Sequence, residues 1–180
     1  AVLDALKRML NLRQTHLPMD QGLDLLILPE LAVHPDDVQT HLVRFVRQTK
    51  TMVLAGLTYQ QLEAGMPMVN SALWVVPEWS KDHGYQVRTY RQGKYHLSHD
   101  ELVFNRGLRR VMGFRPCQWL IGLKWSSSSR PLRLTSAVCY DATDLQLASE
   151  LRDKSDVFAV LALNRDVETF DQMAIALNYH

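Results

Sequence analysis

Continuous apolar runs, separated by helical patterns, are the feature that most constrains the fold of this chain. Leu23–Leu28 is apolar at every position except Asp24 and ends at Pro29. A run without polar alternation indicates a strand buried on both faces. Further strands are predicted at Met52–Leu57, Ser71–Val76, Tyr85–Tyr90, Trp119–Leu123, Leu132–Val138 and Val157–Leu163. Buried strands that alternate with helices predict a layered α/β domain.

The helices are predicted from apolar spacing and from their first residues. Residues 2–16 carry leucines at near-helical spacing and read as an amphipathic helix. Pro35–Asp37 opens a second helix, because proline suits the first turn and acidic groups favour the positive end of the helix dipole. The buried stripe of that helix is expected at Val38, Leu42, Phe45 and Val46.

The second half of the chain is expected to begin with a loop. Residues 98–116 are rich in Arg, Gly and Pro and predict an irregular segment over a site. Thr143 with Gln146 fits a capping box for a helix that ends near Arg152. Asp166 can cap a last helix. We expect a single domain over residues 1–180, and a piece of a longer chain, because the sequence begins and ends inside helical patterns.

Composition excludes several classes of protein. Twenty basic residues nearly balance nineteen acidic residues, so bulk charge gives no argument for nucleic acid or an anionic membrane. No apolar run is long enough to span a bilayer, and the N-terminus has no signal-peptide pattern. Cys117 and Cys139 lie far apart without a CxxC motif, which predicts no disulfide framework and a reducing cytoplasm. The seven histidines have no ligand spacing that predicts a metal, and no cofactor is expected.

Three chemically distinct residues stand where apolar runs break off. Glu30 closes DLLILPE, Lys94 lies in RTYRQGKYHL, and Cys139 closes RLTSAVCYD. Ligands of α/β sheets gather outside the carboxyl ends of the strands. A carboxylate, an ammonium and a thiol at such ends can serve as base, oxyanion stabiliser and nucleophile, which is the set for acyl transfer through a thioester. Taken singly, each residue also fits a structural role, as a surface charge or a buried thiol.

Cys139 has the strongest local context of the three. It follows an apolar strand and precedes Tyr140, Asp141 and a predicted helix. A thiol at a strand-to-helix junction is expected to have its thiolate favoured by the helix dipole. The next backbone N–H, that of Tyr140, can hold an oxyanion.

These stretches carry a family resemblance. The chain resembles the nitrilase, or carbon–nitrogen hydrolase, superfamily in DLLILPEL, GKYHL and SAVCYD, with secondary matches at Gly56, Asn70–Ala72 and Pro77. The resemblance implies a four-layer α/β/β/α sandwich and a triad of Glu30, Lys94 and Cys139. It also implies a second glutamate near the lysine, for which Glu101 and Asp100 both remain candidates. In that arrangement Glu101 positions substrate or Lys94, and Tyr140 supports the substrate.

The resemblance also leaves alternatives open. It implies hydrolysis of a small amide or nitrile without choosing between them, and homo-oligomers packed sandwich to sandwich. Members of the family usually have a strand before the first helix and strands after the last one, so the sandwich is expected to be incomplete at both ends. NRDVETFDQMAIALNYH is similar to nitrilase-like domains linked to bacterial reverse transcriptases in antiphage defence. That likeness implies a binding or assembly module, with nucleic acid reached only through other domains.

Overall fold

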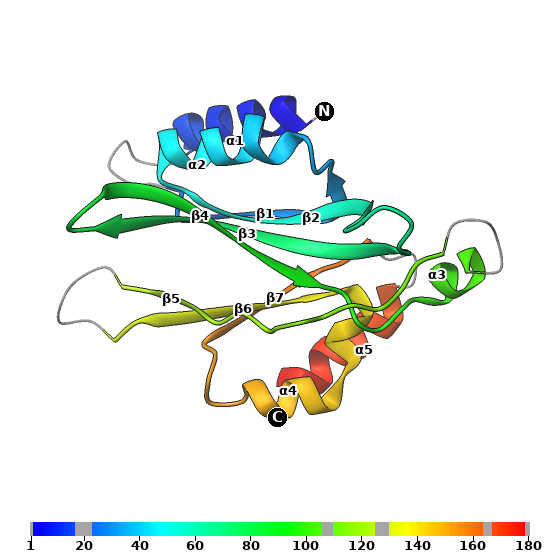
Figure 1. Ribbon diagram of the computed structural model, residues 1–180. Helices are drawn as coiled ribbons and strands as arrows, with labels where there is room; N and C mark the ends of the chain where they lie inside the picture. The colour runs from blue at the N-terminus through cyan, green and yellow to red at the C-terminus, as the bar shows by residue number, and fades with distance from the viewer. Residues whose placement is uncertain (1, 17–22, 106–109, 125–129, 164–166, 179–180) are drawn as a thin grey trace.

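The protein is a sandwich of two sheets between two layers of helices, as the computed structural model shows (Figure 1). Helices α1 (Val2–His16) and α2 (Arg44–Thr49) cover one sheet, and α4 (Leu145–Leu151) and α5 (Val167–Asn178) cover the other. A π-helical turn, η1 (Val38–Val43), leads into α2. The structure describes residues 2–16, 23–105, 110–124, 130–163 and 167–178.

The first sheet has the order β1-β2-β3-β4. Strand β1 (Leu25–Val33) pairs in parallel with β2 (Met52–Gln61). Strands β3 (Met68–Ser80) and β4 (Gly84–Gly93) follow as antiparallel neighbours joined by short turns. The pairing of β1 with β2 shifts register between Leu28 and Val33, so this part of β1 is a bulge.

The second sheet has the order β5-β6-β7. Strand β6 (Leu132–Val138) lies in the middle, antiparallel to β5 (Ile121–Leu123) and parallel to β7 (Val157–Leu161). A 3₁₀ turn, η2 (Cys139–Thr143), follows β6 directly. Helix α3 (His99–Phe104) lies between the two sheets in sequence and packs at one end of the sandwich (Figure 1).

The core has one apolar layer between the sheets and one beneath each helical layer. In β2, Val53, Ala55 and Leu57 pack toward α1 and α2, while Met52 and Leu54 pack toward the second sheet. This strand therefore buries both faces, as its unbroken apolar run predicts. Met52 and Leu54 of β2 therefore belong to the apolar layer between the two sheets. The residues after Leu57 lie at the edge of the core.

The fold class predicted from the sequence is confirmed, and so is the order of helices and strands apart from α3. Helix α1 covers the residues predicted for it, and β6 has the predicted bounds. The predicted cap at Asp166 lies outside the described residues.

Three local predictions are wrong. Strand β1 does not end at Pro29 but continues through the bulge to Val33. The stretch at 98–116 is not wholly irregular, because Ser98 and Glu101 form a capping box that starts α3. Helix α4 is capped by Asp144 rather than Thr143, since the Asp144 carboxylate accepts the N–H groups of Gln146 and Leu147.

Candidate active site

Glu30, Lys94 and Cys139 come together from three strands. Lys94 directly follows the last residue of β4, and Cys139 directly follows the last residue of β6, as the sequence predicts. Glu30 lies inside the bulge of β1, where the next residue, Leu31, has a left-handed backbone with φ of 58°. Such a φ is strained for a branched side chain, and strain of this kind is concentrated at functional sites.

Lys94 joins two buried carboxylates. Its Nζ lies 3.0 Å from Glu30 Oε1 and 2.7 Å from Glu101 Oε2. Lys94 is 1% exposed, and Glu30 and Glu101 are 4% and 1% exposed. A buried ammonium requires such partners, because removing a charge from water costs several kcal/mol or more. The second glutamate predicted near the lysine is therefore placed at Glu101, and Asp100 makes no such contact.

Neutral donors complete the hydrogen bonds of both carboxylates. The Asn70 side-chain amide donates to Glu30 Oε1 at 2.7 Å and to Glu101 Oε1 at 3.2 Å. The Tyr59 hydroxyl donates to Glu101 Oε1 at 2.9 Å. The backbone N–H of Leu163, just after β7, donates to Glu30 Oε2 at 3.0 Å. Each carboxylate is thus fixed by at least two groups besides the lysine or its own helix.

The ion pair shifts the pKa of both its members toward the charged forms. Burial alone would lower the pKa of Lys94, but the hydrogen bond to Glu101 and the charge of Glu30 raise it. Burial alone would raise the pKa of Glu101, but the hydrogen bonds from Lys94 and from the Ser98 backbone N–H lower it. Lys94 therefore remains an ammonium and Glu101 a carboxylate over the neutral range.

The Cys139 thiol faces the Glu30 carboxylate. The charge of Glu30 raises the pKa of that thiol, and the Lys94 ammonium and the Tyr140 backbone N–H act in the opposite direction. Cys139 is 4% exposed and has a left-handed backbone with φ of 50°. Burial, followed by the charge of Glu30, raises the pKa of Cys139 to about 12. The expectation that a helix dipole favours the thiolate is wrong, because a short 3₁₀ turn follows Cys139, and burial together with the charge of Glu30 outweighs the Lys94 ammonium.

A third buried carboxylate ties the lysine segment to the cysteine turn. Asp141 is fully buried and accepts the backbone N–H groups of Tyr95 and His96, the latter at 2.7 Å. Arg115 Nη1 lies 3.7 Å from the same carboxylate. Because Tyr95 follows Lys94 and Asp141 lies two residues after Cys139, this contact fixes the ammonium relative to the thiol.

Tyr140 contributes through its backbone at this site. Its ring packs edge-on against Phe170 of α5, with 6.4 Å between the ring centroids. The N–H of Tyr140 lowers the pKa of the adjacent Cys139 thiol.

Sequence reasoning missed Tyr59 as a partner of the carboxylates and noted Asn70 only as a secondary match. Tyr59 follows the apolar part of β2, which is the same kind of position that singled out Glu30. The pattern SHDE also signals a capping box, which would have placed Glu101 at the start of a helix. Within the described residues, no group of three or more His, Cys, Asp or Glu side chains could hold a metal ion. None of the described helices is long and apolar enough to cross a membrane.

Solved structures similar to this one are carbon–nitrogen hydrolases. A CN-hydrolase superfamily protein from Xanthomonas campestris matches with a TM-score of 0.54 and 15% identity, over 97% of this chain and 65% of its own. A variant of the Nesterenkonia AN1 amidase, from the nitrilase superfamily, matches with a TM-score of 0.56 and 15% identity, over 98% and 66%. No family model and no curated protein matches the sequence. The chain thus has the nitrilase-type fold and spans 65% of the Xanthomonas protein.

Proposed function

We propose that this protein is a cysteine-dependent hydrolase of a non-peptide C–N bond, in an amide or a nitrile, that acts through a thioester. One observation carries the proposal: the Glu30 carboxylate is paired with the Lys94 ammonium at 3.0 Å and lies near enough to the Cys139 thiol to raise the pKa of that thiol. A base near the nucleophile, beside a fixed cation, is the arrangement that activated nucleophiles require. Glu30, Lys94 and Cys139 are accordingly the proposed catalytic residues, with Glu101 as a positioning residue.

The first half of the reaction forms the thioester. As Cys139 Sγ bonds to the amide carbon, the thiol proton passes to Glu30. The Lys94 ammonium and the Tyr140 backbone N–H hold the oxyanion that develops. The C–N bond then breaks, and Glu30 returns the proton to the nitrogen that leaves as ammonia or an amine. The raised pKa of Cys139 fits this order, because the proton stays on sulfur until the carbon is attacked.

The second half consumes water. Glu30 takes a proton from a water molecule whose oxygen attacks the thioester carbon. The C–S bond breaks, the acid is released, and the proton returns from Glu30 to the sulfur. A nitrile would first form a thioimidate with the same thiol, and this adds one water and loses ammonia to give the same thioester, so the proposal covers both.

Known complexes of a similar protein support small amides as the substrate class. Variants of the Nesterenkonia AN1 amidase have been solved with acrylamide and with butyramide. The acrylamide complex matches this chain with a TM-score of 0.56 and 16% identity, over 98% of this chain and 65% of that one. Primary amides of this kind are therefore the first compounds to test.

Ammonia release tests the proposal. The protein is incubated with a panel of primary amides and nitriles, and ammonia is measured together with the intact mass of the protein. We expect release that is abolished in Cys139→Ala and retained in Cys117→Ala, since the Cys117 thiol donates to the Arg91 carbonyl oxygen at 3.8 Å. Mass spectrometry should find the acyl adduct on Cys139. Release that survives Cys139→Ala overturns the proposal.

A binding or assembly module is the second candidate, within a reverse-transcriptase-linked defence protein. The observation that favours assembly is the exposure of large apolar side chains beside α4 and α5: Leu145 is 75% exposed and Leu163 is 65% exposed. Exposed apolar surface can mark contacts with other chains, including a homo-oligomer. In that case Cys139→Ala keeps the biological activity of the full protein.

We also propose a cytoplasmic location, because Cys117 and Cys139 are both free thiols.

A further inference from the structure

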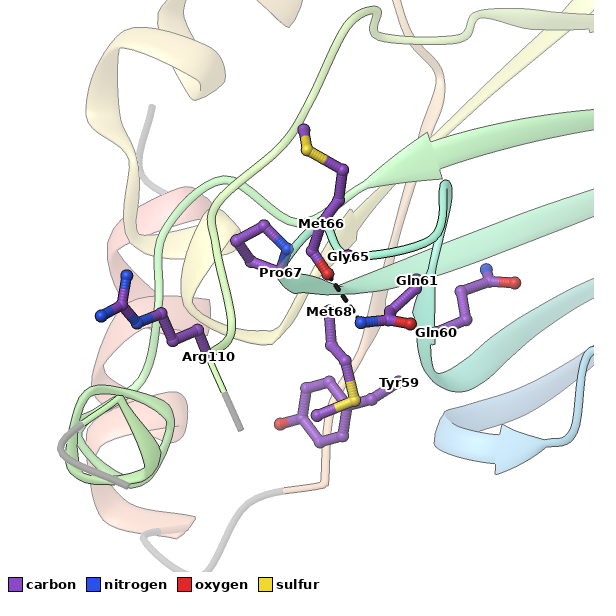
Figure 2. A pocket seen from close by; sticks show the side chains of 8 residues that line it. All are labelled: Tyr59, Gln60, Gln61, Gly65, Met66, Pro67, Met68 and Arg110. Carbon is purple, nitrogen blue, oxygen red and sulfur yellow. Dashed lines mark hydrogen bonds between the residues drawn. The ribbon is translucent and has the colours of Figure 1, made fainter. Parts of the chain in front are cut away.

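A pocket of about 580 Å³ lies at the end of the β2–β3 hairpin (Figure 2). Its walls come from the last residues of β2, from the turn that follows, and from Arg110. Tyr59, Met66, Pro67 and Met68 supply an apolar lining, and Gln60 and Gln61 supply amide groups. A volume of this size is typical of small-molecule sites, which range over roughly 300–1,000 Å³.

Tyr59 connects this pocket with the proposed chemistry. Its ring lines the pocket, while its hydroxyl donates to Glu101, whose other oxygen holds Lys94. Glu30, Lys94 and Cys139 do not line the pocket. The pocket is therefore joined to the proposed catalytic residues through Tyr59 and Glu101.

Arg110 gives the pocket its charge. Its backbone is fixed to the wall, because its carbonyl oxygen accepts the Met68 N–H at 2.8 Å. Figure 2 shows its side chain at the rim, across from Gln60 and Gln61. The side chain is exposed, and among the described residues no carboxylate pairs with it. A guanidinium without a partner at a pocket rim is suited to bind a carboxylate, with two parallel N–H donors.

We propose that this pocket receives the non-reacting end of the amide substrate, and that this end carries a carboxylate bound by Arg110. The inference rests on the proposed function and narrows its substrate class to amides with a terminal carboxylate. Tyr59, Met66 and Met68 then contact the apolar chain between the two ends.

Binding to the Cys139→Ala protein tests the inference without needing the chemistry. The probes are the monoamides of succinate, glutarate, adipate and suberate, each paired with the neutral primary amide of equal chain length. Calorimetry should find at least one monoamide bound about tenfold more tightly than its neutral pair, as a charge-assisted hydrogen bond provides. Arg110→Gln in the same background should remove the preference, and Arg110→Lys should keep part of it. Arg47→Gln, on the outer layer, is the matched control and should change nothing.

The outcomes separate this inference from the proposed function. Equal affinity within every pair, a preference that survives Arg110→Gln, or no binding by any monoamide overturns the inference. If the unaltered protein hydrolyses neutral amides equally well, the proposed function stands and the inference fails. If monoamide binding depends on Arg110 but no amide is hydrolysed, the pocket stands and the proposed function fails.

Discussion

Gly56 of β2 lies directly against the backbone of Glu30. A Cβ at Gly56 would lie 2.4 Å from Glu30 Cα and 2.4 Å from the Pro29 carbonyl oxygen. Real Cβ atoms do not approach backbone so closely, so only glycine fits where β2 passes the bulge of β1. The position of the proposed base therefore depends on a residue with no side chain.

Gly56→Ala should accordingly destabilise the fold and displace Glu30. We expect a loss of about 1–3 kcal/mol in the free energy of unfolding, as for overpacked cores, together with a large loss of any amide hydrolysis. Denaturant unfolding measures the first effect. Gly122→Ala is the matched control, because a Cβ there meets only the Pro131 side chain at 3.9 Å. Equal free energies of unfolding for Gly56→Ala and Gly122→Ala would show that the bulge of β1 shifts to make room for the added methyl group.

The sequence was sufficient to predict the layers and the positions of two triad residues. Unbroken apolar runs mark strands buried on both faces, and their ends place Lys94 and Cys139. Glu30 pairs with Lys94, but it does not lie at the end of its strand as the apolar run predicts. The chain does not end its strand at Pro29; it bulges, and the bulge depends on Gly56, which lies 26 residues further along the sequence.

The partners of the site were harder to predict, because they come from long-range contacts. Tyr59 meets Glu101 across 42 residues, and Leu163 meets Glu30 across 133. Neither contact leaves a pattern in the neighbouring sequence from which it could be predicted. The thiol pKa was predicted in the wrong direction for the same reason: the dipole argument uses only the neighbours in sequence, whereas burial and Glu30 dominate in space.

Glu30→Gln should have opposite effects on the Cys139 thiol and on its chemistry. Removing the carboxylate removes a charge that raises the pKa of Cys139, so that pKa should fall below its value of about 12. Ultraviolet thiolate absorbance, titrated with pH, measures this. Hydrolysis should nevertheless fall by about 10²–10⁴-fold, the usual contribution of a general base. A pKa that stays the same would mean that Glu30 does not act on the thiol.

Glu101→Gln should alter how stability depends on pH. The folded protein lowers the pKa of Glu101 below its ordinary 4.5, so the ion pair with Lys94 stabilises the fold above that pH. This contribution is lost as the pH falls below about 4.5. We therefore expect the variant to be less stable by about 3 kcal/mol at neutral pH, and the difference to shrink in acid. Urea unfolding at several pH values measures it; a constant difference contradicts the pairing.

Tyr59→Phe should weaken the hold on Glu101 while keeping the ring in the pocket wall. Burial, followed by the charge of Glu101, raises the pKa of Tyr59, so its hydroxyl remains a donor at every pH at which the protein is folded. Losing that hydrogen bond should cost about 1 kcal/mol in the free energy of unfolding and should raise the pKa of Glu101. Tyr85→Phe, on the exposed β3–β4 hairpin, should cost less. Similar losses in the free energy of unfolding for both variants would show that the hydrogen bond from Tyr59 to Glu101 adds no particular stability.

The left-handed backbone at Cys139 predicts an unusual effect on stability, because its φ of 50° is strained for any residue with a Cβ. In ordinary strands and helices, alanine is more stable than glycine by roughly 0.5–1 kcal/mol. At this position the order should reverse: Cys139→Gly should be at least as stable as Cys139→Ala, because glycine relieves the strain. Thermal and urea unfolding of the two variants, both without a thiol, give the comparison. If alanine is the more stable by the usual margin, the turn at Cys139 stores no strain.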